Sequence, residues 1–369
     1  MADKSRRLLS LDTLRGFDMF FIMGVEVLLM RICSCFDGPV SGFVATQMDH
    51  AEWHGFTFMD TIFPLFLFIS GISWTFSYAK QKAGGVPDGK IYMKVFRRTL
   101  ILILFGCVYN GLLATFDFAG ARYCSVLGRI GIAWMLAAVI YMNFSRVWRI
   151  VWVVAILVGY WLLLALNVAP DAPAGAGPFS LEGNIVGYVD RMIMPGSLYL
   201  GIFDPEGLLS NIPAVATALL GMFTGDFVRR EDMNGNRKTV LMFCAAAVLL
   251  AAGLLWGLVF PVNKNLWTSS FVLVCAAYSV AVFALFYWII DVRGYTRWTT
   301  FFTVIGLNSI TIYMLSSAVN FSSISRFFFG GLASLMPECW GQVVLSAGYV
   351  LICWLLLHLL YRHKIFLKV

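Results

Sequence analysis

One stretch of the sequence, residues 49–71, reads DHAEWHGFTFMDTIFPLFLFISG. It opens as a polar segment with His50, His54 and Asp60 and continues into a long apolar run. Such a run predicts a membrane-spanning helix, because a transmembrane helix needs about 20 largely apolar residues. Titratable side chains at the mouth of a membrane helix are costly, so they indicate a functional site.

The composition of the whole chain is typical of a membrane protein. Of the 369 residues, 60% are hydrophobic and 13% are charged, and the mean hydropathy is +0.81. A soluble domain cannot bury so much apolar surface. Helices are expected, because a helix in lipid satisfies its own backbone hydrogen bonds. We therefore predict an all-α polytopic membrane protein, a single transmembrane domain over residues 1–369, with about ten transmembrane helices at 13–33, 57–79, 95–115, 126–144, 150–168, 208–226, 239–260, 267–291, 299–320 and 340–361.

The basic residues predict the orientation of these helices. If the amino terminus, with Lys4, Arg6 and Arg7, is cytoplasmic, then all but six of the 27 Lys and Arg residues fall on the cytoplasmic side. This bias is the positive-inside pattern, and ten spans then place both termini in the cytoplasm and His50 on the outer face. The net charge of +7 follows from this bias and from contact with anionic lipid, so no nucleic-acid partner is expected. The six outer basic residues are Arg31, Arg122, Arg129, Arg191, Lys264 and Arg326.

Cysteines near the outer face are compatible with a disulfide in an oxidising compartment. The connectivity cannot be read from the sequence, which leaves several pairings open. No Cys-x-x-Cys pair occurs, and no metal is expected. The four cysteines concerned, of eight in the chain, are Cys33, Cys35, Cys124 and Cys339.

Three carboxylates fall within the first two predicted helices. Asp18 and Glu26 are eight residues apart, about two turns, so both should point into the protein and not at lipid. Glu26 lies near the outer end of its helix, on the side of His50. Asp60 either belongs to the same site or is simply stabilised by the dipole at the start of its helix. His54 follows His50 by four residues, so the two imidazoles share a face if the helix already begins there.

Short polar motifs occur in a fixed order along nearly the whole chain. They are 10–16 (SLDTLRG), 50–55 (HAEWHG) with Asp60 and 63–64 (FP), 66–71 (FLFISG), 127–131 (LGRIG), 204–213 (DPEGLLSNIP), 263–270 (NKNLWTSS) and 306–310 (GLNSI). In this order they resemble the heparan-α-glucosaminide N-acetyltransferase family and its bacterial relatives. Glu26 stands where many members of the family have an asparagine.

The resemblance implies a multispanning acyltransferase that moves an acetyl group from cytosolic acetyl-CoA to the amine of a glucosamine-type sugar on the far side of the membrane. It implies that His50 is the active-site residue, and that the chain lies in a bacterial inner membrane with His50 on the periplasmic side. An imidazole with a pKa near 6.5 suits the proton transfer that attack by an amine requires. We therefore predict an enzyme with His50, Glu26 and Asp60 as catalytic residues. Its partners would be the bilayer, acetyl-CoA and an amino sugar, and a homodimer is compatible with the sequence.

Other polar residues are candidates for binding the acceptor or acetyl-CoA. Asn308 and Ser309 could donate hydrogen bonds to the thioester carbonyl, or could equally bond one helix to another. Aromatic and polar residues of the outer loops could contact the acceptor, or could serve as interfacial anchors. These outer-loop candidates are Trp53, Lys264, Asn265 and Trp267.

Charged residues complete the set of binding candidates. Asp204 and Glu206 belong to an acidic outer surface that could attract a cationic amino group, although acidic loops also serve solubility alone. Arg15, Arg98 and Arg129 could meet the phosphates of acetyl-CoA, or could act only as determinants of topology.

A proton-coupled transporter of a small sugar or similar solute is the alternative function. Asp18, Glu26 and Asp60 would then relay protons across the membrane. No duplication of the first five spans in the last five is evident, which argues against this reading. The outer segment 169–207, rich in Pro, Gly and Ala at its start, is predicted to form a lid over the active-site mouth.

Overall fold

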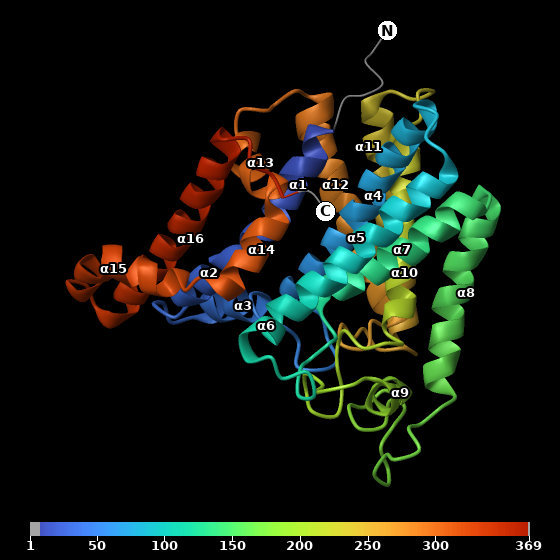
Figure 1. The fold of residues 1–369 in the computed structure, drawn as a ribbon, viewed down its shortest axis with the longest axis horizontal. Helices are drawn as coiled ribbons and strands as arrows, with labels where there is room; N and C mark the ends of the chain where they lie inside the picture. The colour runs from blue at the N-terminus through green and yellow to red at the C-terminus, as the bar shows by residue number, and fades with distance from the viewer. Residues whose placement is uncertain (1–7, 368–369) are drawn as a thin grey trace. The chain divides into compact units, whose positions relative to one another are not determined.

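The computed structural model describes residues 8–367, apart from the side chain of Ala114, and this part of the chain is helical (Figure 1). Lys4, Arg6 and Arg7, which enter the charge count, lie outside the described residues. Within the described part, seven helices are long and apolar enough to cross a membrane: Met59–Ala83, Val126–Asn143, Arg146–Ala165, Asn211–Val228, Gly235–Gly257, Ser269–Val292 and Glu338–Arg362. The prediction of an all-α polytopic membrane protein is confirmed at this level. The count of ten spans and the side of the termini remain predictions.

The first predicted span is not one continuous helix. It consists of α1 (Leu9–Phe20), a short π-helical stretch η1 (Phe21–Val25) and α2 (Glu26–Cys33). Gly24 interrupts the helical backbone with a φ of 118°, a conformation that a residue with a Cβ rarely adopts. Glu26 therefore begins a separate helix.

The span predicted at 299–320 is also broken. It divides into α13 (Thr299–Leu307) and α14 (Ser309–Ala318), which are bent by 65° about Asn308. If this pair is counted as one span, the described chain has up to eight. The span predicted at 95–115 lies in α5 (Asp88–Tyr109), whose first half carries four basic residues.

The other elements have the following bounds: α3 (Pro39–Gln47), η2 (Met59–Thr61), α4 (Ile62–Ala83), α6 (Leu112–Thr115), α7 (Val126–Asn143), α8 (Arg146–Ala165), α9 (Ile185–Ile193), α10 (Asn211–Val228), α11 (Gly235–Gly257), α12 (Ser269–Phe286), η3 (Tyr287–Val292), α15 (Phe321–Ser334) and α16 (Glu338–Arg362).

The chain divides into two compact units. Unit 1 contains the segments Met1–Ala51, Thr57–Ile62 and Leu285–Lys368, and unit 2 contains Glu52–Phe56 and Phe63–Ala284. The loop around the two histidines is therefore shared, with His50 in unit 1 and His54 in unit 2. A single functional domain over residues 1–369 remains a prediction.

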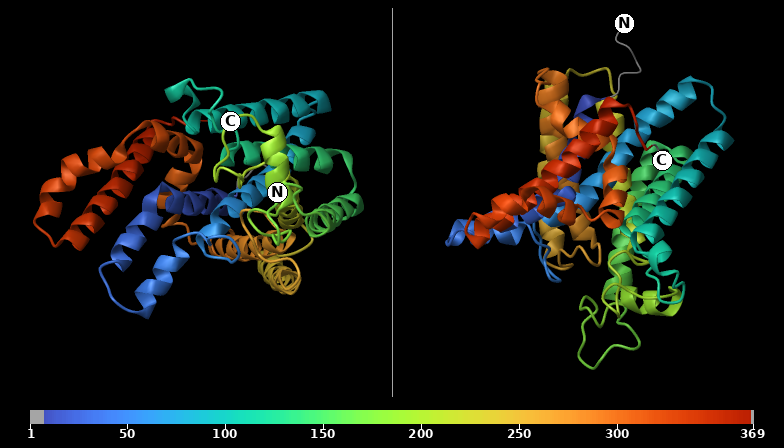
Figure 2. Two further views of the ribbon diagram at one scale, coloured as in Figure 1. Left: turned by 90° about the horizontal axis from the view of Figure 1, so that it is seen from below. Right: turned by 60° about the vertical axis from the view of Figure 1, so that its left-hand side comes forward.

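Close helix packing builds unit 1. A Cβ atom added to Gly16 of α1 would lie 1.8 Å from the carbonyl oxygen of Phe302 in α13, and one added to Gly306 would lie 2.1 Å from that of Asp12. The two glycines therefore let the backbones of α1 and α13 touch, as small residues do in membrane bundles. Helices α15 and α16 lie side by side, which both views of Figure 2 show in red.

A disulfide between Cys35 and Cys339 also lies in unit 1. It joins the segment after α2 to the first turn of α16, across a sequence separation of 304 residues. Cys33 and Cys124, the other two candidates for an outer disulfide, are free thiols. The pairing that the sequence left open is thus Cys35 with Cys339.

In unit 2, glycines likewise allow the backbones of α4 and α10 to touch. A Cβ on Gly71 would lie 2.3 Å from the carbonyl oxygen of Ala218, and one on Gly221 would lie 2.1 Å from that of Phe68. Both helices are largely buried. By contrast, only 17% of the apolar window of α11 is buried inside the protein, so most of this helix faces outward.

Candidate active site

The carboxylate of Asp60 organises the loop that carries His50. Asp60 is fully buried in η2, and its Oδ2 accepts hydrogen bonds from the backbone N–H of Thr57 (3.0 Å) and of Ala51 (3.4 Å). The hydroxyl of Thr57 lies 3.0 Å from the same oxygen and 2.6 Å from the carbonyl oxygen of Asp49. An acidic side chain that reaches back to the N–H of the residue three positions earlier is half of a capping box. These bonds fix the position of the Asp60 carboxylate inside unit 1.

The second oxygen of Asp60 binds His50. Nδ1 of His50 lies 2.9 Å from Oδ1 of Asp60, and about half of the His50 side chain (52%) is exposed while that of Asp60 is not (0%). A carboxylate that accepts from Nδ1–H fixes the tautomer in which Nε2 carries the free lone pair. The pair therefore presents an oriented, half-exposed imidazole that can serve as a base or a nucleophile.

His54 lies in a different environment, in unit 2. Its Nδ1 lies 3.3 Å from Nδ2 of Asn263, and burial lowers the pKa of the imidazole. The backbone N–H of Gly55 donates to the carbonyl of Val262 at 3.0 Å, which ties this part of the loop to the segment before α12. Residues 50–57 are not helical, so the two imidazoles do not share the helix face that the spacing allowed.

The outer-loop candidates of unit 2 gather around the same segment. Trp53 donates from Nε1 to the carbonyl of Phe179 (2.8 Å), and Asn265 lies 3.5 Å from the carbonyl of Glu52. Trp267 is buried, with its Nε1 3.3 Å from Oγ1 of Thr217. Lys264 lies between Asn263 and Asn265, in the turn that precedes α12. The structure therefore brings Trp53, Asn263 and Asn265 to one loop cluster.

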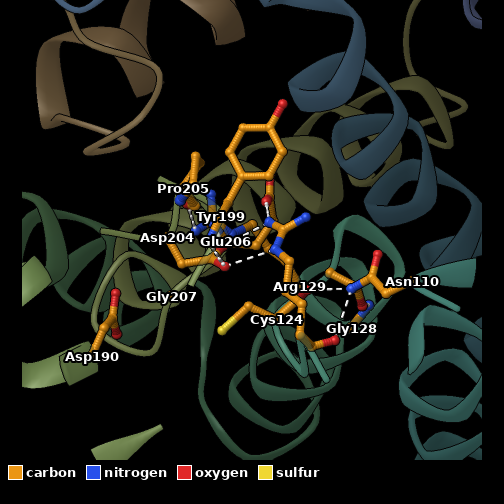
Figure 3. A network of polar contacts seen from close by, with 12 residues as sticks. Asn110, Cys124, Gly128, Arg129, Asp190, Tyr199, Asp204, Pro205, Glu206 and Gly207 are labelled. Atoms are coloured by element: carbon orange, nitrogen blue, oxygen red, sulfur yellow. Dashed lines mark hydrogen bonds and ion pairs between the residues drawn. The ribbon is translucent and has the colours of Figure 1, made fainter. Parts of the chain in front are cut away.

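A network of polar contacts and ion pairs lies in the segment that precedes α10 (Figure 3). The guanidinium of Arg122 binds both oxygens of Asp204 at 2.7 Å and also binds Glu206. These carboxylates raise the pKa of Arg122 above its ordinary value, although burial opposes them. Buried Arg129 donates to the carbonyl of Pro205 and to Ser210. The candidates Asp204, Glu206 and Arg129 thus all have partners within unit 2.

Asp190 of α9 lies beside this network. Its Oδ1 accepts from the N–H of Leu208 at 2.7 Å, whereas its Oδ2 is buried without a hydrogen-bond partner in the described chain. Burial raises the pKa of Asp190 to about 7, and nearby Asp204 adds to the rise. A Cβ on Gly207 would lie 1.8 Å from Oδ2, so any larger residue there would require the Asp190 side chain to move.

Asn308 lies at the bend between α13 and α14, where it contacts the carboxyl-terminal segment. Its Nδ2 donates to the carbonyl of Ile365 (3.0 Å), and its Oδ1 lies 3.4 Å from the N–H of Leu367. Oδ1 also accepts from the hydroxyl of Thr311 at 3.3 Å. The side chain is buried, as is that of neighbouring Ser309. Both the nitrogen and the oxygen of the Asn308 amide thus contact the carboxyl-terminal segment.

The remaining candidates lie apart along the chain. Glu26 is half-buried at the first position of α2, and Arg15 pairs with Asp12 at 3.3 Å within α1. The guanidinium of Arg98 lies over the ring of Trp134, 4.3 Å from its centre. Among the described residues, no group of three or more His, Cys, Asp or Glu side chains is arranged to hold a metal ion.

Two residues with clear roles in this geometry were not among the sequence candidates. Thr57 supports Asp60, and the T-x-x-D spacing of a capping box was the signal that could have identified it. Arg122 pairs with Asp204 across 82 positions, and no local pattern marks such a contact.

Two curated proteins are similar to almost the whole chain. The human protein named heparan-alpha-glucosaminide N-acetyltransferase is 27% identical over 418 aligned residues, which cover 98% of this chain and 60% of the human protein. The sequence resemblance to this family is confirmed. The mouse protein of the same name is 25% identical over 421 residues, which cover 99% of this chain and 61% of the mouse protein. No protein-family model matches the chain.

The chain spans about three fifths of the length of these relatives. The name of these relatives describes transfer of an acetyl group to an amino sugar. The similarity covers all of the motifs on which the resemblance rests, from the SLDTLRG segment to Asn308.

Proposed function

We propose that the chain is a transmembrane N-acetyltransferase that moves an acetyl group from acetyl-CoA to the amine of a glucosamine-type sugar. The observation that carries the proposal is the pairing of exposed His50 with buried Asp60 at 2.9 Å. A His–carboxylate pair serves acyl transfer on many unrelated folds, because the carboxylate orients the imidazole and stabilises its protonated form. The names of the human and mouse relatives supply the group transferred and the class of acceptor.

The reaction follows from this geometry. The amine nitrogen attacks the thioester carbonyl, a C–N bond forms, the C–S bond breaks, and coenzyme A leaves as its thiol. Nε2 of His50 takes the proton from the amine and returns it to the leaving sulfur, which is general base followed by general acid catalysis. In a two-step route Nε2 first carries the acetyl group itself and then passes it to the amine. Retention of label on the protein after incubation with labelled acetyl-CoA alone distinguishes the two-step route from direct transfer.

Other residues take supporting roles in the proposal. Glu26 orients the amine, and Asn308 donates from Nδ2 to the thioester carbonyl in place of the Ile365 carbonyl. Arg15 and Arg98 are the candidates for the phosphates of coenzyme A. Arg129 and Asp204 instead hold the outer segment 169–207 in place, because Arg129 donates to the carbonyl of Pro205 and Asp204 binds the guanidinium of Arg122.

We place His50 on the periplasmic side of a bacterial inner membrane. The distribution of basic residues supports this side. The disulfide between Cys35 and Cys339 supports it too, because disulfides persist in oxidising compartments and are rare in the cytosol. Acetyl-CoA would then enter from the cytoplasmic side, and the segment 169–207 would cover the outer mouth.

Release of free thiol tests the proposal. Purified protein is incubated with acetyl-CoA and a panel of amino sugars, and the coenzyme A released is titrated. We expect release that depends on an acceptor with a free amine and none with the N-acetylated sugar. Acceptor-independent release, or none with any amino sugar of the panel, would contradict the proposal.

A proton-coupled transporter is the second candidate, and Asp18 is the observation that favours it. Asp18 is fully buried in α1, and neither carboxylate oxygen has a hydrogen-bond partner in the described chain. Buried intramembrane carboxylates are typical of proton relays. Accumulation of an amino sugar in proteoliposomes without acetyl-CoA would favour the transporter.

A further inference from the structure

An apolar groove runs between α10, α11 and α12 in unit 2. Its volume is about 310 Å³. One of the nine lining residues carries a polar side-chain group, and that residue is Thr224, whose hydroxyl donates to the carbonyl of Leu220 in its own helix. The groove therefore presents no unsatisfied polar group to an occupant. The lining residues are Leu220, Phe223, Thr224, Phe227, Leu241, Met242, Ala245, Leu249 and Val280.

The groove opens toward the lipid phase. All three helices have the length and composition of membrane spans. Leu241 and Ala245 of α11 are exposed, and Phe223 and Phe227 of α10 are half-buried. Such a surface is covered by hydrocarbon in a membrane, and its hollow shape suits a single flexible chain.

A basic side chain continues the stripe of α11 residues that lines this groove, and two more follow the end of α10. On α11 the lining residues Leu241 and Ala245 follow Arg237 at four-residue steps, so Arg237 lies on the same helix face one turn earlier. Beyond the end of α10 at Val228, the chain continues with Arg229 and Arg230. The connection between the two helices, Arg229–Lys238, carries four basic and two acidic residues. One end of the groove is therefore cationic.

Arg237 is the basic residue that is available to a ligand. Its side chain is exposed and has no ion pair or hydrogen bond within the described chain. Arg230 instead pairs with Asp232, at 2.5 Å between Nη2 and Oδ2, and Lys238 donates from Nζ to the carbonyl of Val228 at 2.7 Å. Lys238 thereby joins the end of α10 to the start of α11 and holds that end of the groove.

We propose that this groove binds one anionic phospholipid, with an acyl chain between α10 and α11 and the phosphate at Arg237. The apolar lining fits the chain and the cationic end fits the charge of the head group. Basic pockets at the ends of membrane helices bind anionic lipid in this way. A bound acyl chain would also fill the space beside α11, which is poorly packed against the rest of unit 2. The groove shares no residue with the His50–Asp60 pair and does not depend on the acetyltransferase proposal.

Native mass spectrometry of the detergent-purified protein tests this site. The protein is titrated with phosphatidylglycerol or with phosphatidylcholine that has the same acyl chains. We expect one molecule of phosphatidylglycerol to bind about fivefold more tightly than phosphatidylcholine, the ratio that one basic side chain near a phosphate supports. Arg237→Gln should remove this preference, whereas Arg146→Gln, at the start of α8, should keep it.

A second pair of variants tests the groove itself. Ala245→Trp places an indole in the groove and should abolish the tight site. Val248→Trp adds the same ring to an exposed position of α11 that does not line the groove, and it should bind lipid as wild type does. Equal affinity for the two lipids, or tight binding that survives Ala245→Trp, would overturn the proposal. Melting temperatures measured without added lipid show that each variant is folded.

Discussion

His50 and Asp60 form a pair in which the exposed partner is held by the buried one, with Nδ1 and Oδ1 2.9 Å apart. Because Asp60 is itself fixed by the backbone of Thr57 and Ala51, the imidazole has one orientation imposed from inside unit 1. The half-exposed imidazole is thereby oriented for chemistry at the surface. This relationship leads to the first prediction.

Asp60→Asn should lower the turnover of acetyl transfer while largely preserving the fold. The amide has the same shape but no charge, so it cannot stabilise the imidazolium or enforce the Nδ1–H tautomer; in a triad this change costs about 10⁴-fold. We expect a loss of at least about 10²-fold in kcat. Asp37→Asn, in the exposed connection after α2, is the control and should keep wild-type turnover. Wild-type kcat in Asp60→Asn would mean that the carboxylate does not assist His50.

The proposed sidedness predicts how a new thiol at Ser41 will react. Ser41 lies in α3, between the disulfide residue Cys35 and His50. In a Cys33→Ser background, Ser41→Cys should be labelled by a membrane-impermeant thiol reagent added to intact cells. Labelling that requires cell lysis would place His50 on the cytoplasmic side and reverse the proposed direction of transfer.

The raised pKa of Asp190 predicts that the stability of the protein depends on pH. Its pKa in the folded protein, about 7, lies above its ordinary value of 3.8 because the side chain is buried. Protonated Asp190 is therefore favoured by folding, and its contribution to stability is full below about pH 4 and is lost as the pH rises through about 7.

Asp190→Asn removes this titration and keeps an oxygen for the N–H of Leu208. The melting temperature of the variant minus that of wild type should therefore increase between pH 5.5 and pH 8. A difference that is constant with pH would show that Asp190 does not titrate in this range.

Two changes that break the contact between Asn308 and Ile365 should affect catalysis differently. If Nδ2 of Asn308 stabilises the developing oxyanion, Asn308→Ala should lower kcat by about 10²–10³-fold. Deletion from Ile365 onward removes the carbonyl that now occupies Nδ2, and it should leave kcat at or above the wild-type value. Equal losses of kcat and of melting temperature in both variants would mean that the contact only holds the carboxyl-terminal segment.

Local patterns in the sequence identified much of the site in unit 1. The polar segment before an apolar run placed His50 and Asp60 near one another, and the structure joins them by a direct contact. The apolar runs likewise predicted the long helices, because span length and hydropathy are properties of local sequence. The breaks at Gly24 and Asn308 depend on backbone conformation, which hydropathy does not report.

Contacts between distant segments could not be predicted in this way. The pairing of Cys35 with Cys339 needed the placement of α16 against α2. Arg129 was a candidate for a phosphate ligand because it is basic, but its buried partners Pro205 and Ser210 come from 76 and 81 positions away. His54 was grouped with His50 by spacing, and the structure gives it a separate partner in Asn263.

Acetyl transfer by His50→Ala and His54→Ala, measured side by side with wild type, tests the central claim most directly. Loss of a general base costs about 10²–10⁴-fold in rate, so His50→Ala should lose nearly all transfer while still folding and binding acetyl-CoA. His54→Ala should retain most of the activity, because the imidazole of His54 lies against the amide of Asn263 and the ring of Trp53. Wild-type turnover in His50→Ala would contradict the account.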